Sequence, residues 1–303
     1  SAHGAVKQVQ RYLVEGYRVA VDVDLSKFFD RVNHDLLMAR LSRHLPDKRL
    51  LKLIGRYLRA GVIIDEVLHP TSEGVPQGGP LSPLLANVML DDFDKHLEAR
   101  QMRFARYADD FVICVKSTSA GHRVMQWVNR FLTTKLKLVV NAKKSRVVRT
   151  NDIHFLGFTF RGNKMRWTEE ALADFKHRIR QLTKRSWGIS MHRRYRELRR
   201  YIQGWMNYFG LSEYYRPLPL LDEWLRRRIR MCYLKQWRKP RTRIRNLIRL
   251  GVGTQTAVSL GLSSKGLYRL ARTLATQSGM TNKWLTEQGL VSIREQWITL
   301  HYA

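Results

Sequence analysis

Short runs in which apolar and polar residues alternate dominate the first half of the chain. Residues 17–25 place Leu25 and the valines before it on one face of an extended strand, and Asp22 and Asp24 on the other. Asp24 stands at the end of this run, before two aromatic residues and a turn. We interpret Asp24 as a candidate metal ligand. The alternative is that both aspartates line an exposed strand face.

A second pattern of this kind occupies residues 102–115, where two runs rich in β-branched and aromatic residues surround Asp109 and Asp110. It predicts a β-hairpin with two adjacent carboxylates at its tip. Adjacent like charges repel, so a rigid turn that carries them favours a bound cation, and oxygen ligands suit Mg²⁺ or Mn²⁺. A solvated acidic turn is the alternative interpretation of an isolated Asp-Asp pair.

Apolar residues recur at helical spacing between and after these runs. From Trp167 onward the pattern is helical throughout. An antiparallel sheet interleaved with helices predicts an α+β fold of the ferredoxin-like kind, followed by an all-α region. The expected helices are 4–15, 35–45, 47–59, 82–93 and 120–136, and the further expected strands are 62–68, 138–148 (two strands around a turn) and 155–160.

Residues 73–83 form a loop rich in glycine and proline. Glycine lets the backbone approach a ligand closely because it has no Cβ, and proline stiffens the loop. Ser82 and Pro83 suit the N-cap and first position of the helix that follows. A generic loop of this composition says little about function. Between two candidate metal strands, however, it is a natural floor for a template base.

Charge and cysteine content narrow the class of protein. The chain carries 55 Lys and Arg against 25 Asp and Glu, a formal net charge of +30, which indicates a polyanionic partner. An anionic membrane surface would attract the same charge, but no run of about 18 apolar residues exists, so we expect no membrane partner. Cys114 and Cys232 have no partner at short spacing, which excludes a disulfide framework and a zinc knuckle and fits a reducing compartment.

Most of the excess positive charge lies in the second half, since residues 1–160 have a net charge of +9 and residues 161–303 a net charge of +21. The helices there also carry an apolar stripe, and their aromatic residues follow its period, so we interpret those as core rather than as base-stacking platforms. Guanidinium groups suit phosphate. The predicted nucleic-acid contacts are Arg193, Arg196, Arg199, Arg200, Arg226, Arg227, Arg228, Arg230, Arg241, Arg243 and Arg245.

Five motifs follow one another in the first 160 residues, and together they resemble the palm motifs of reverse transcriptases, most closely those of bacterial group II intron proteins. They are Val-Asp-Val-Asp24-Leu-Ser-Lys-Phe-Phe29-Asp, Glu-Gly-Val-Pro-Gln77-Gly78-Gly-Pro-Leu-Ser-Pro, Tyr-Ala-Asp109-Asp110, Val-Asn141-Ala-Lys-Lys144-Ser and Phe-Leu-Gly157-Phe. Residues 198–209, which contain Gly204-Trp205, and residues 237–245 resemble the maturase (thumb, or X) domain of that family.

The resemblance implies roles for several residues. Asp24 and Asp109 would bridge two Mg²⁺ ions, for which Mn²⁺ is a possible substitute, with Asp110 beside them and the Leu25 carbonyl as a backbone ligand. Two such ions activate a primer 3′-hydroxyl and stabilise the leaving pyrophosphate. Phe29 would favour dNTPs over ribonucleotides, unless it is a core phenylalanine. Gln77 and Gly78 would line the template and nucleotide pocket, and Lys144 would approach the triphosphate unless it is an exposed turn lysine.

We therefore expect a reverse transcriptase palm with a remnant of the fingers at residues 1–165 and a helical thumb/maturase domain at 166–303. The expected function is RNA-directed DNA polymerisation together with assistance to intron splicing and retrohoming, in the cytoplasm of a bacterium. The expected partners are intron RNA, an RNA template with its DNA primer, dNTPs and target DNA. The alternative is an RNA-binding splicing factor with a catalytically silent polymerase site. The Gly204-Trp205 region argues against retron and diversity-generating lineages.

Two departures from the family pattern shape these expectations. The family's N-terminal segment supplies most of the fingers and closes over the nucleotide. The likeness of this chain starts partway through that segment, so the resemblance does not imply polymerase activity of the chain by itself. The family's Cys/His-bearing nuclease domain has no counterpart within residues 1–303, and we expect no second-strand DNA cleavage by this chain.

Overall fold

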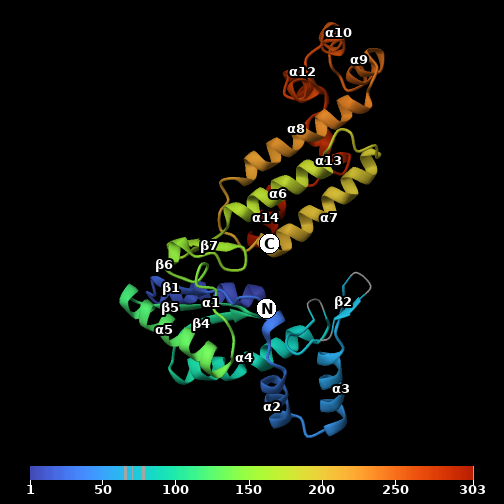
Figure 1. Ribbon diagram of the computed structural model, residues 1–303. Coiled ribbons are helices and arrows are strands. Elements are labelled where there is room, and N and C mark those ends of the chain that lie inside the picture. The colour runs from blue at the N-terminus through green and yellow to red at the C-terminus, as the bar shows by residue number, and fades with distance from the viewer. Residues whose placement is uncertain (65–66, 70, 77–78, 303) are drawn as a thin grey trace. The chain divides into compact units, whose positions relative to one another are not determined.

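The computed structural model of the protein describes residues 1–64, 67–69, 71–76 and 79–302. The chain divides into two compact units, Ser1–Met165 and Arg166–Ala303 (Figure 1). Each unit has its own hydrophobic core, the first around a sheet and its helices and the second among helices alone. The boundary falls within a short strand, β8 (Lys164–Trp167).

A four-stranded antiparallel sheet organises the first unit. Its strands are β1 (Val19–Val23), β4 (Arg103–Tyr107), β5 (Asp110–Val115) and β6 (Arg146–Arg149), in the spatial order β4-β5-β1-β6. Along the chain, helix α4 (Ser82–Ala99) lies between β1 and β4, and α5 (Thr118–Lys135) lies between β5 and β6. This is the βαββαβ succession of a ferredoxin-like fold. The strand predicted in residues 17–25 and the hairpin predicted in 102–115 are confirmed.

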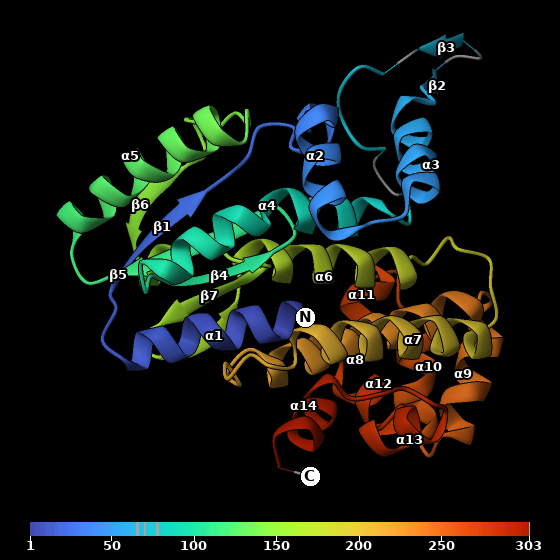
Figure 2. The ribbon, with the colours of Figure 1, turned by 90° about the horizontal axis from the view of Figure 1, so that it is seen from below.

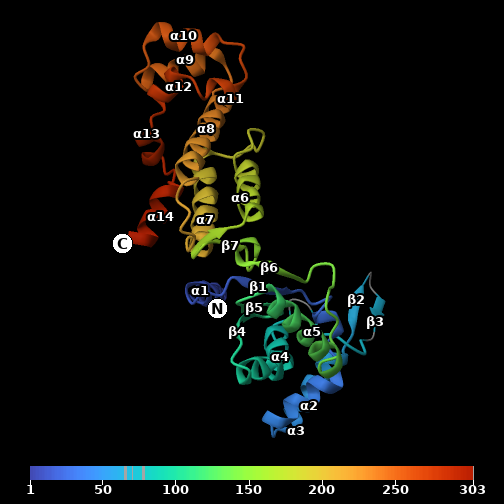
Figure 3. The same ribbon diagram turned by 90° about the vertical axis from the view of Figure 1, so that its left-hand side faces the viewer.

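The register of the sheet places apolar side chains over α4 and α5. Val23 is paired with Phe111 and Val21 with Ile113, and all four are buried in one core with these two helices. The opposite face of the sheet meets α1 (Ala2–Val14), which Figure 3 shows on the other side from α4 and α5. The period of two in the sequence thus separates two differently covered faces.

Two helices and a small hairpin stand beside the sheet (Figure 2). Helix α2 (His34–His44) begins at an Asn33 cap and α3 (Lys48–Arg59) at an Asp47 cap, as the pattern predicts within a residue or two. The prediction of one strand at 62–68 is wrong, because the segment forms two short antiparallel strands, β2 (Val62–Ile64) and β3 (Val67–His69). The acidic residues 65 and 66 interrupt the apolar run at this point.

The prediction of two strands within residues 138–148 is also wrong for the first of them. Only β6 is a regular strand, whereas Val140 makes a single bridge to Leu25, and the Ser26 N–H donates to the Val139 carbonyl at 2.8 Å. This arm pairs with the residues that follow β1 instead of folding back on β6. The strand expected at 155–160 is β7 (Phe158–Arg161), which pairs with β8 outside the four-stranded sheet.

The second unit is helical, as the sequence predicts. Helices α6 (Glu169–Leu182), α7 (Met191–Phe209) and α8 (Leu218–Gln236) lie side by side in Figures 1 and 3. The apolar stripe of α7, including Leu198 and Ile202, is buried among them. The remaining helices are α9 (Pro240–Arg249), α10 (Thr254–Leu262), α11 (Leu267–Leu270), α12 (Leu274–Gly279), α13 (Asn282–Glu287) and α14 (Ile293–Tyr302).

A search of the described part of the chain finds no helix with the length and apolarity that crossing a membrane requires.

Candidate functional site

The strand register gathers acidic residues on the sheet face opposite α4 and α5. Asp22 is paired with Val112 across β1 and β5, so their side chains share a face. Asp110 lies two residues before Val112 and Asp24 two residues after Asp22, which assigns both to that same face. Continuing the register by one pair, beyond Val23 and Phe111, brings Asp24 opposite Asp110.

Asp109 occupies the two-residue turn between β4 and β5. Its neighbour Ala108 has φ +55°, a left-handed conformation that a tight hairpin turn requires and that alanine adopts at some energetic cost. Arg106 holds the turn, because its guanidinium donates to the Ala108 carbonyl at 2.8 Å and to the Asp94 carboxylate of α4 at 2.8 Å. Arg106 therefore fixes the turn to α4.

Burial and neighbouring carboxylates raise the pKa of Asp110 to about 6 from its ordinary value of 3.8. Burial is the larger cause, and the negative charges of Asp22, Asp109 and Asp24 add to it. The backbone N–H of Leu156 acts in the opposite direction by donating to the Asp110 carboxylate. That N–H belongs to a turn in which Leu156 has φ +53° and Gly157 has φ +77°. The Phe-Leu-Gly157-Phe motif thus contacts the acidic cluster through its main chain.

Asp22 differs from its acidic neighbours because it has a cationic partner. Arg146, its register partner on β6, lies with Nε 3.4 Å from Asp22 Oδ2. Burial raises the pKa of Asp22 despite this arginine. Since its charge is already partly balanced, Asp22 is a weaker candidate for binding a cation than Asp24, Asp109 or Asp110.

Asp24 is held by the turn at residues 141–145. Asn141 Nδ2 donates to Asp24 Oδ2 at 2.9 Å, and the Asn141 N–H donates to the Asp24 carbonyl at 2.8 Å. The Asp24 N–H donates to Ser145 Oγ at 3.1 Å. Sequence reasoning placed Asn141 and Ser145 in a motif without giving them a role. No local signal indicates this role, because the partner of Asn141 lies 117 positions away in the chain.

The oxygen-only donor set of Asp24, Asp109 and Asp110 suits Mg²⁺ or Mn²⁺. After burial, the negative charges of Asp22, Asp109 and Asp24 also raise the pKa of Asp110, and a bound cation would offset this repulsion between carboxylates. Across the residues with described positions, no group of three or more His, Cys, Asp or Glu side chains that could hold a metal ion is found. Mg²⁺ is commonly held by one or two carboxylates together with substrate phosphates, so a complete protein cage is not required.

The glycine-rich loop is attached to the segment that follows Asp24. The Val75 N–H donates to the Phe29 carbonyl at 2.5 Å, and the Gly74 N–H to the Val32 carbonyl at 2.8 Å. Gly74 has φ +91°, and a Cβ there would come within 2.8 Å of the Asp30 carbonyl oxygen, so the close approach needs glycine. The loop thus begins next to Phe29.

The remaining nucleotide-pocket residues are placed to different extents. Phe28 is buried in the core, whereas Phe29 is half-buried with its ring 5.2 Å from that of Phe28. Lys144 is exposed on the turn that holds Asp24. Leu25 is buried and bridged to Val140. Gln77 and Gly78 lie outside the described residues.

The arginines predicted to bind nucleic acid fall into three groups by exposure. Arg226, Arg227 and Arg228 are half-buried, and Arg227 Nε donates to the Tyr268 carbonyl at 3.1 Å. Arg230 and Arg243 are buried. The exposed group is Arg193, Arg196, Arg199, Arg200, Arg241 and Arg245.

The prediction that Arg230 and Arg243 contact phosphate is wrong for the folded chain. Both side chains are buried, at 5% and 9% exposure. Arg230 Nε donates to the Met280 carbonyl at 2.8 Å, and Arg243 Nη1 to the Gly261 carbonyl at 3.2 Å. These guanidinium groups join helices inside the unit, because backbone carbonyls there need donors.

Comparisons with known proteins identify the family of the chain. Residues 4–160, more than half of the chain, match the family described as reverse transcriptase (RNA-dependent DNA polymerase). The chain therefore belongs to the reverse transcriptase family. Residues 172–251 match the group II intron, maturase-specific domain, so within that family the chain is of the group II intron reverse transcriptase/maturase type. The predicted family and the predicted α+β fold with a helical C-terminal region are confirmed.

Individual relatives cover parts of the chain. Protein YkfC of Escherichia coli (strain K12) is 32% identical over 203 residues, which are 54% of this chain and 52% of YkfC. Group II intron-encoded protein LtrA of Lactococcus lactis subsp. cremoris is 30% identical over 148 residues, 49% of this chain and 24% of LtrA. The chain thus spans about half the length of YkfC and a quarter of LtrA. The apo telomerase from Candida tropicalis matches 99% of this chain and 57% of its own with 12% identity and a TM-score of 0.46.

Proposed function

We propose that the protein is an RNA-directed DNA polymerase that also binds its intron RNA as a maturase, assisting splicing and retrohoming into target DNA. The observation that carries this proposal is the face of the sheet on which Asp24 and Asp110 meet beside Asp109, within a chain of the reverse transcriptase family. The maturase-specific match of residues 172–251 supports the RNA-binding part.

In the proposed reaction, Asp24, Asp109 and Asp110 hold two Mg²⁺ ions together with the phosphates of a dNTP. The ions supply Lewis acidity for an in-line displacement at the α-phosphate. The protein's own residues position the groups: Asn141 and Ser145 fix Asp24, and the Arg106 contact fixes the turn of Asp109. No protein nucleophile is needed, because the primer 3′-hydroxyl attacks.

Two further parts of the chain serve the substrates in this proposal. Phe29 lies under the sugar of the incoming nucleotide, next to the loop that begins at Gly74. Lys144 approaches the triphosphate from its exposed turn. The exposed arginines of α7 and α9 bind the phosphates of RNA.

Primer extension tests the polymerase. Wild-type chain, D109N and D24N are supplied with Mg²⁺, dNTPs and a DNA primer on an RNA template. Wild type is expected to extend the primer, and both variants to lose at least about a hundredfold in rate, in line with the removal of groups that act directly on transition-state charge. D152N, at an exposed position outside the cluster, is the matched control and is expected to retain wild-type activity. Extension by wild type no faster than by D109N contradicts the proposal.

One observation favours a second function, that of an RNA-binding splicing factor without polymerase activity. The maturase-specific match of residues 172–251 supports RNA binding and does not depend on the acidic site. This alternative predicts that wild type, D24N and D109N assist splicing of the intron RNA equally well. None of the three proteins would extend a primer. The same variants therefore distinguish the two functions.

A further inference from the structure

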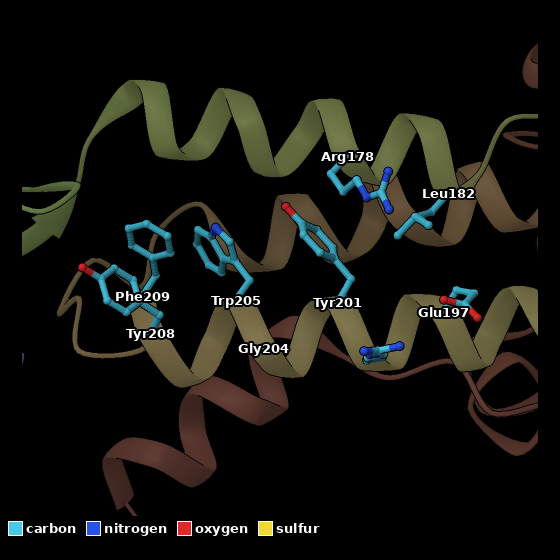
Figure 4. A pocket seen from close by; sticks show the side chains of 9 residues that line it. Arg178, Leu182, Glu197, Tyr201, Gly204, Trp205, Tyr208 and Phe209 are labelled. Carbon is cyan, nitrogen blue, oxygen red and sulfur yellow. The ribbon is translucent and has the colours of Figure 1, made fainter. Parts of the chain in front are cut away.

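A groove of about 480 Å³ runs between α6 and α7 in the helical unit. This volume is within the range of sites that hold small molecules. Figure 4 shows side chains of α7 pointing across the groove toward α6, with Arg178 reaching down from α6 at one end. The groove is lined by Arg178, Leu182, Glu197, Arg200, Tyr201, Gly204, Trp205, Tyr208 and Phe209.

Aromatic rings along the groove are fixed by one another. Trp205 is buried and lies 4.5 Å from the ring of Phe175 and 4.9 Å from that of Phe209, measured between centroids. Tyr201 is half-buried and stacks on Phe175, with centroids 5.7 Å apart and planes at 19°. Tyr201 thus has one face supported by protein and a rim that lines the groove. A ring held in this way loses little conformational entropy when a second flat group stacks against it.

Gly204 has no reason within the protein to be glycine. It lies inside the 19-residue helix α7, where only proline is a poorer helix former. Its φ is not in the positive range, and a Cβ at this position would meet nothing within 4 Å. A glycine that neither packing nor backbone conformation requires leaves open space on the groove wall. That space lets a ligand approach the backbone of α7 closely.

The charges at the groove suit a nucleotide. Arg178 and Arg200 are exposed at its rim, in a half of the chain whose net charge is +21 for residues 161–303. Glu197 lines the same groove, and none of the ion pairs of the described residues involves it. Guanidinium groups bind phosphate, and a carboxylate accepts hydrogen bonds from the amino groups of bases.

From these observations we infer that the α6–α7 groove binds an unpaired nucleotide of single-stranded RNA, its base over Gly204 beside Tyr201 and its phosphates on Arg178 and Arg200. That the strand is RNA rests on the proposed maturase function, whereas the stacking surface and the open glycine wall do not. Stacking on aromatic residues is the common way in which proteins hold unpaired bases. The inference assigns one defined contact to a unit whose charge alone would bind any polyanion.

Filling the groove at Gly204 tests the inference. G204L places a side chain in the open space, and G204A places a methyl group there. Q203L, at the exposed neighbouring position outside this groove, is the matched control for adding leucine to α7. Binding of the full chain to a labelled 12-nucleotide unstructured RNA is measured by fluorescence anisotropy at fixed salt, and folding is measured by thermal denaturation.

We expect G204L to melt no lower than wild type, since leucine is the better helix former. Its affinity for the RNA is expected to be at least about fivefold weaker, the lower end of what one stacked base contributes. The affinity of G204A for the RNA should lie between those of wild type and G204L. Q203L should bind the RNA as wild type does. With an abasic strand of equal charge, wild type and G204L should bind equally, and a DNA strand of the same sequence shows whether the 2′-hydroxyl contributes.

Each outcome separates this inference from the proposed function. RNA binding by folded G204L that equals wild type overturns the groove assignment and leaves the proposed function standing. No binding of the 12-nucleotide RNA by wild type also overturns the groove assignment, whereas only a failure of wild type to bind the intron RNA would overturn the maturase function itself. A loss by G204L that is equally large on the abasic strand overturns the base contact, because charge would then account for binding. Melting of G204L below wild type would show that the space belongs to the protein core, which also contradicts the inference.

Discussion

Asp24 is held through both its backbone and its carboxylate. Its N–H, its carbonyl and its Oδ2 all bond to residues 141–145, more than a hundred positions later in the chain. Side chains that orient a metal ligand commonly affect metal affinity as strongly as some ligands do. Asn141 is therefore a positioning residue whose loss should be visible in the metal dependence of activity.

The first residue-scale prediction concerns Asn141. N141A removes the bond to Asp24 Oδ2 but not the one from the backbone, so the carboxylate keeps its place with less restraint. We expect the Mg²⁺ concentration for half-maximal primer extension to rise about 10–100-fold. K143A, exposed on the same turn, should leave it unchanged. An unaltered Mg²⁺ dependence in N141A would show that the backbone bonds alone orient Asp24.

The second prediction concerns the charge of Asp110 in the metal-free protein. Its pKa in the folded chain, about 6, lies above the ordinary 3.8, so the protonated form is favoured by folding. The stabilisation is fully present below pH 3.8 and is lost as the pH rises through 6. At pH 8 the loss amounts to at most about 3 kcal/mol.

D110N carries no charge and escapes this loss. We expect urea denaturation of the metal-free chain at pH 8 to show D110N as the more stable protein, with the difference shrinking toward pH 5. The same variant should extend primers poorly. A wild-type chain that is as stable as D110N at pH 8 in the presence of EDTA would argue that Asp110 titrates in the ordinary range.

At this scale, the sequence predicted the acidic residues better than their partners. Strand periodicity and turn position make Asp24, Asp109 and Asp110 candidates one by one, and the resemblance to reverse transcriptases groups them in one predicted site. Asn141 does not, because nothing local indicates a bond to a residue 117 positions away. Arg230 and Arg243 were mistaken for phosphate ligands because a helical pattern does not reveal which later segment covers a guanidinium group.

Among the elements, the β4–β5 hairpin depends on a contact with α4. The Arg106 side chain is 11% exposed and reaches Asp94 of α4 and the Ala108 carbonyl of the turn. In R106M the turn would lose both contacts and Asp94 would lose its cation. We expect a destabilisation of about 1–3 kcal/mol and at least tenfold slower primer extension, measured by urea denaturation and by single-nucleotide addition.

R103M is the matched control for that prediction. Arg103 lies on the same strand and pairs with Glu15 at 3.1 Å, but both side chains are 44% exposed. Exposed pairs contribute little to stability. R103M should therefore keep the wild-type denaturation midpoint and rate. If R106M behaved as R103M does, the hairpin would be held by the sheet alone.

Helices and strands were predicted correctly where a periodic pattern extended over many residues. The prediction failed where a segment distant in the sequence determined which strand pairs with which. The two strands of the hairpin and the long helices follow from their own pattern with ends shifted by a few residues, except that α4 continues to Ala99 and so passes its predicted end at residue 93 by about a turn and a half. The arm at 138–140 carries an equally apolar pattern, yet it pairs with the extension of β1 and not with β6. Local composition cannot specify that choice, because both partners offer the same backbone groups.

For the whole molecule, charge decides how RNA affinity depends on salt. Each exposed arginine that neutralises a phosphate contributes about 0.9 to the slope of log affinity against log salt on duplexes and about 0.7 on single strands. In the double variant R193Q/R196Q, the slope of log affinity for the intron RNA against log salt should be smaller in magnitude by about 1–2. The measurement is a salt titration of RNA binding.

R230Q distinguishes exposed from buried charge in that experiment. Arg230 donates to Met280 and Asn282 within the unit, so its replacement should lower the thermal midpoint and leave the salt slope unchanged. A reduced slope in folded R230Q would return Arg230 to the set of phosphate ligands. The +21 charge of residues 161–303 predicted that this half binds a polyanion, but not which arginines face it.

The Leu156–Gly157 turn reaches Asp110 through a peptide N–H and not through a side chain. Alanine scanning would pass over this contact, because every substitution except proline keeps the amide proton. Only an ester linkage in place of that one peptide bond would delete the donor while sparing the surrounding shape. Sequence drift at position 156 can thus change the side chain, within what a φ of +53° tolerates, and still preserve the hydrogen bond that the carboxylate receives.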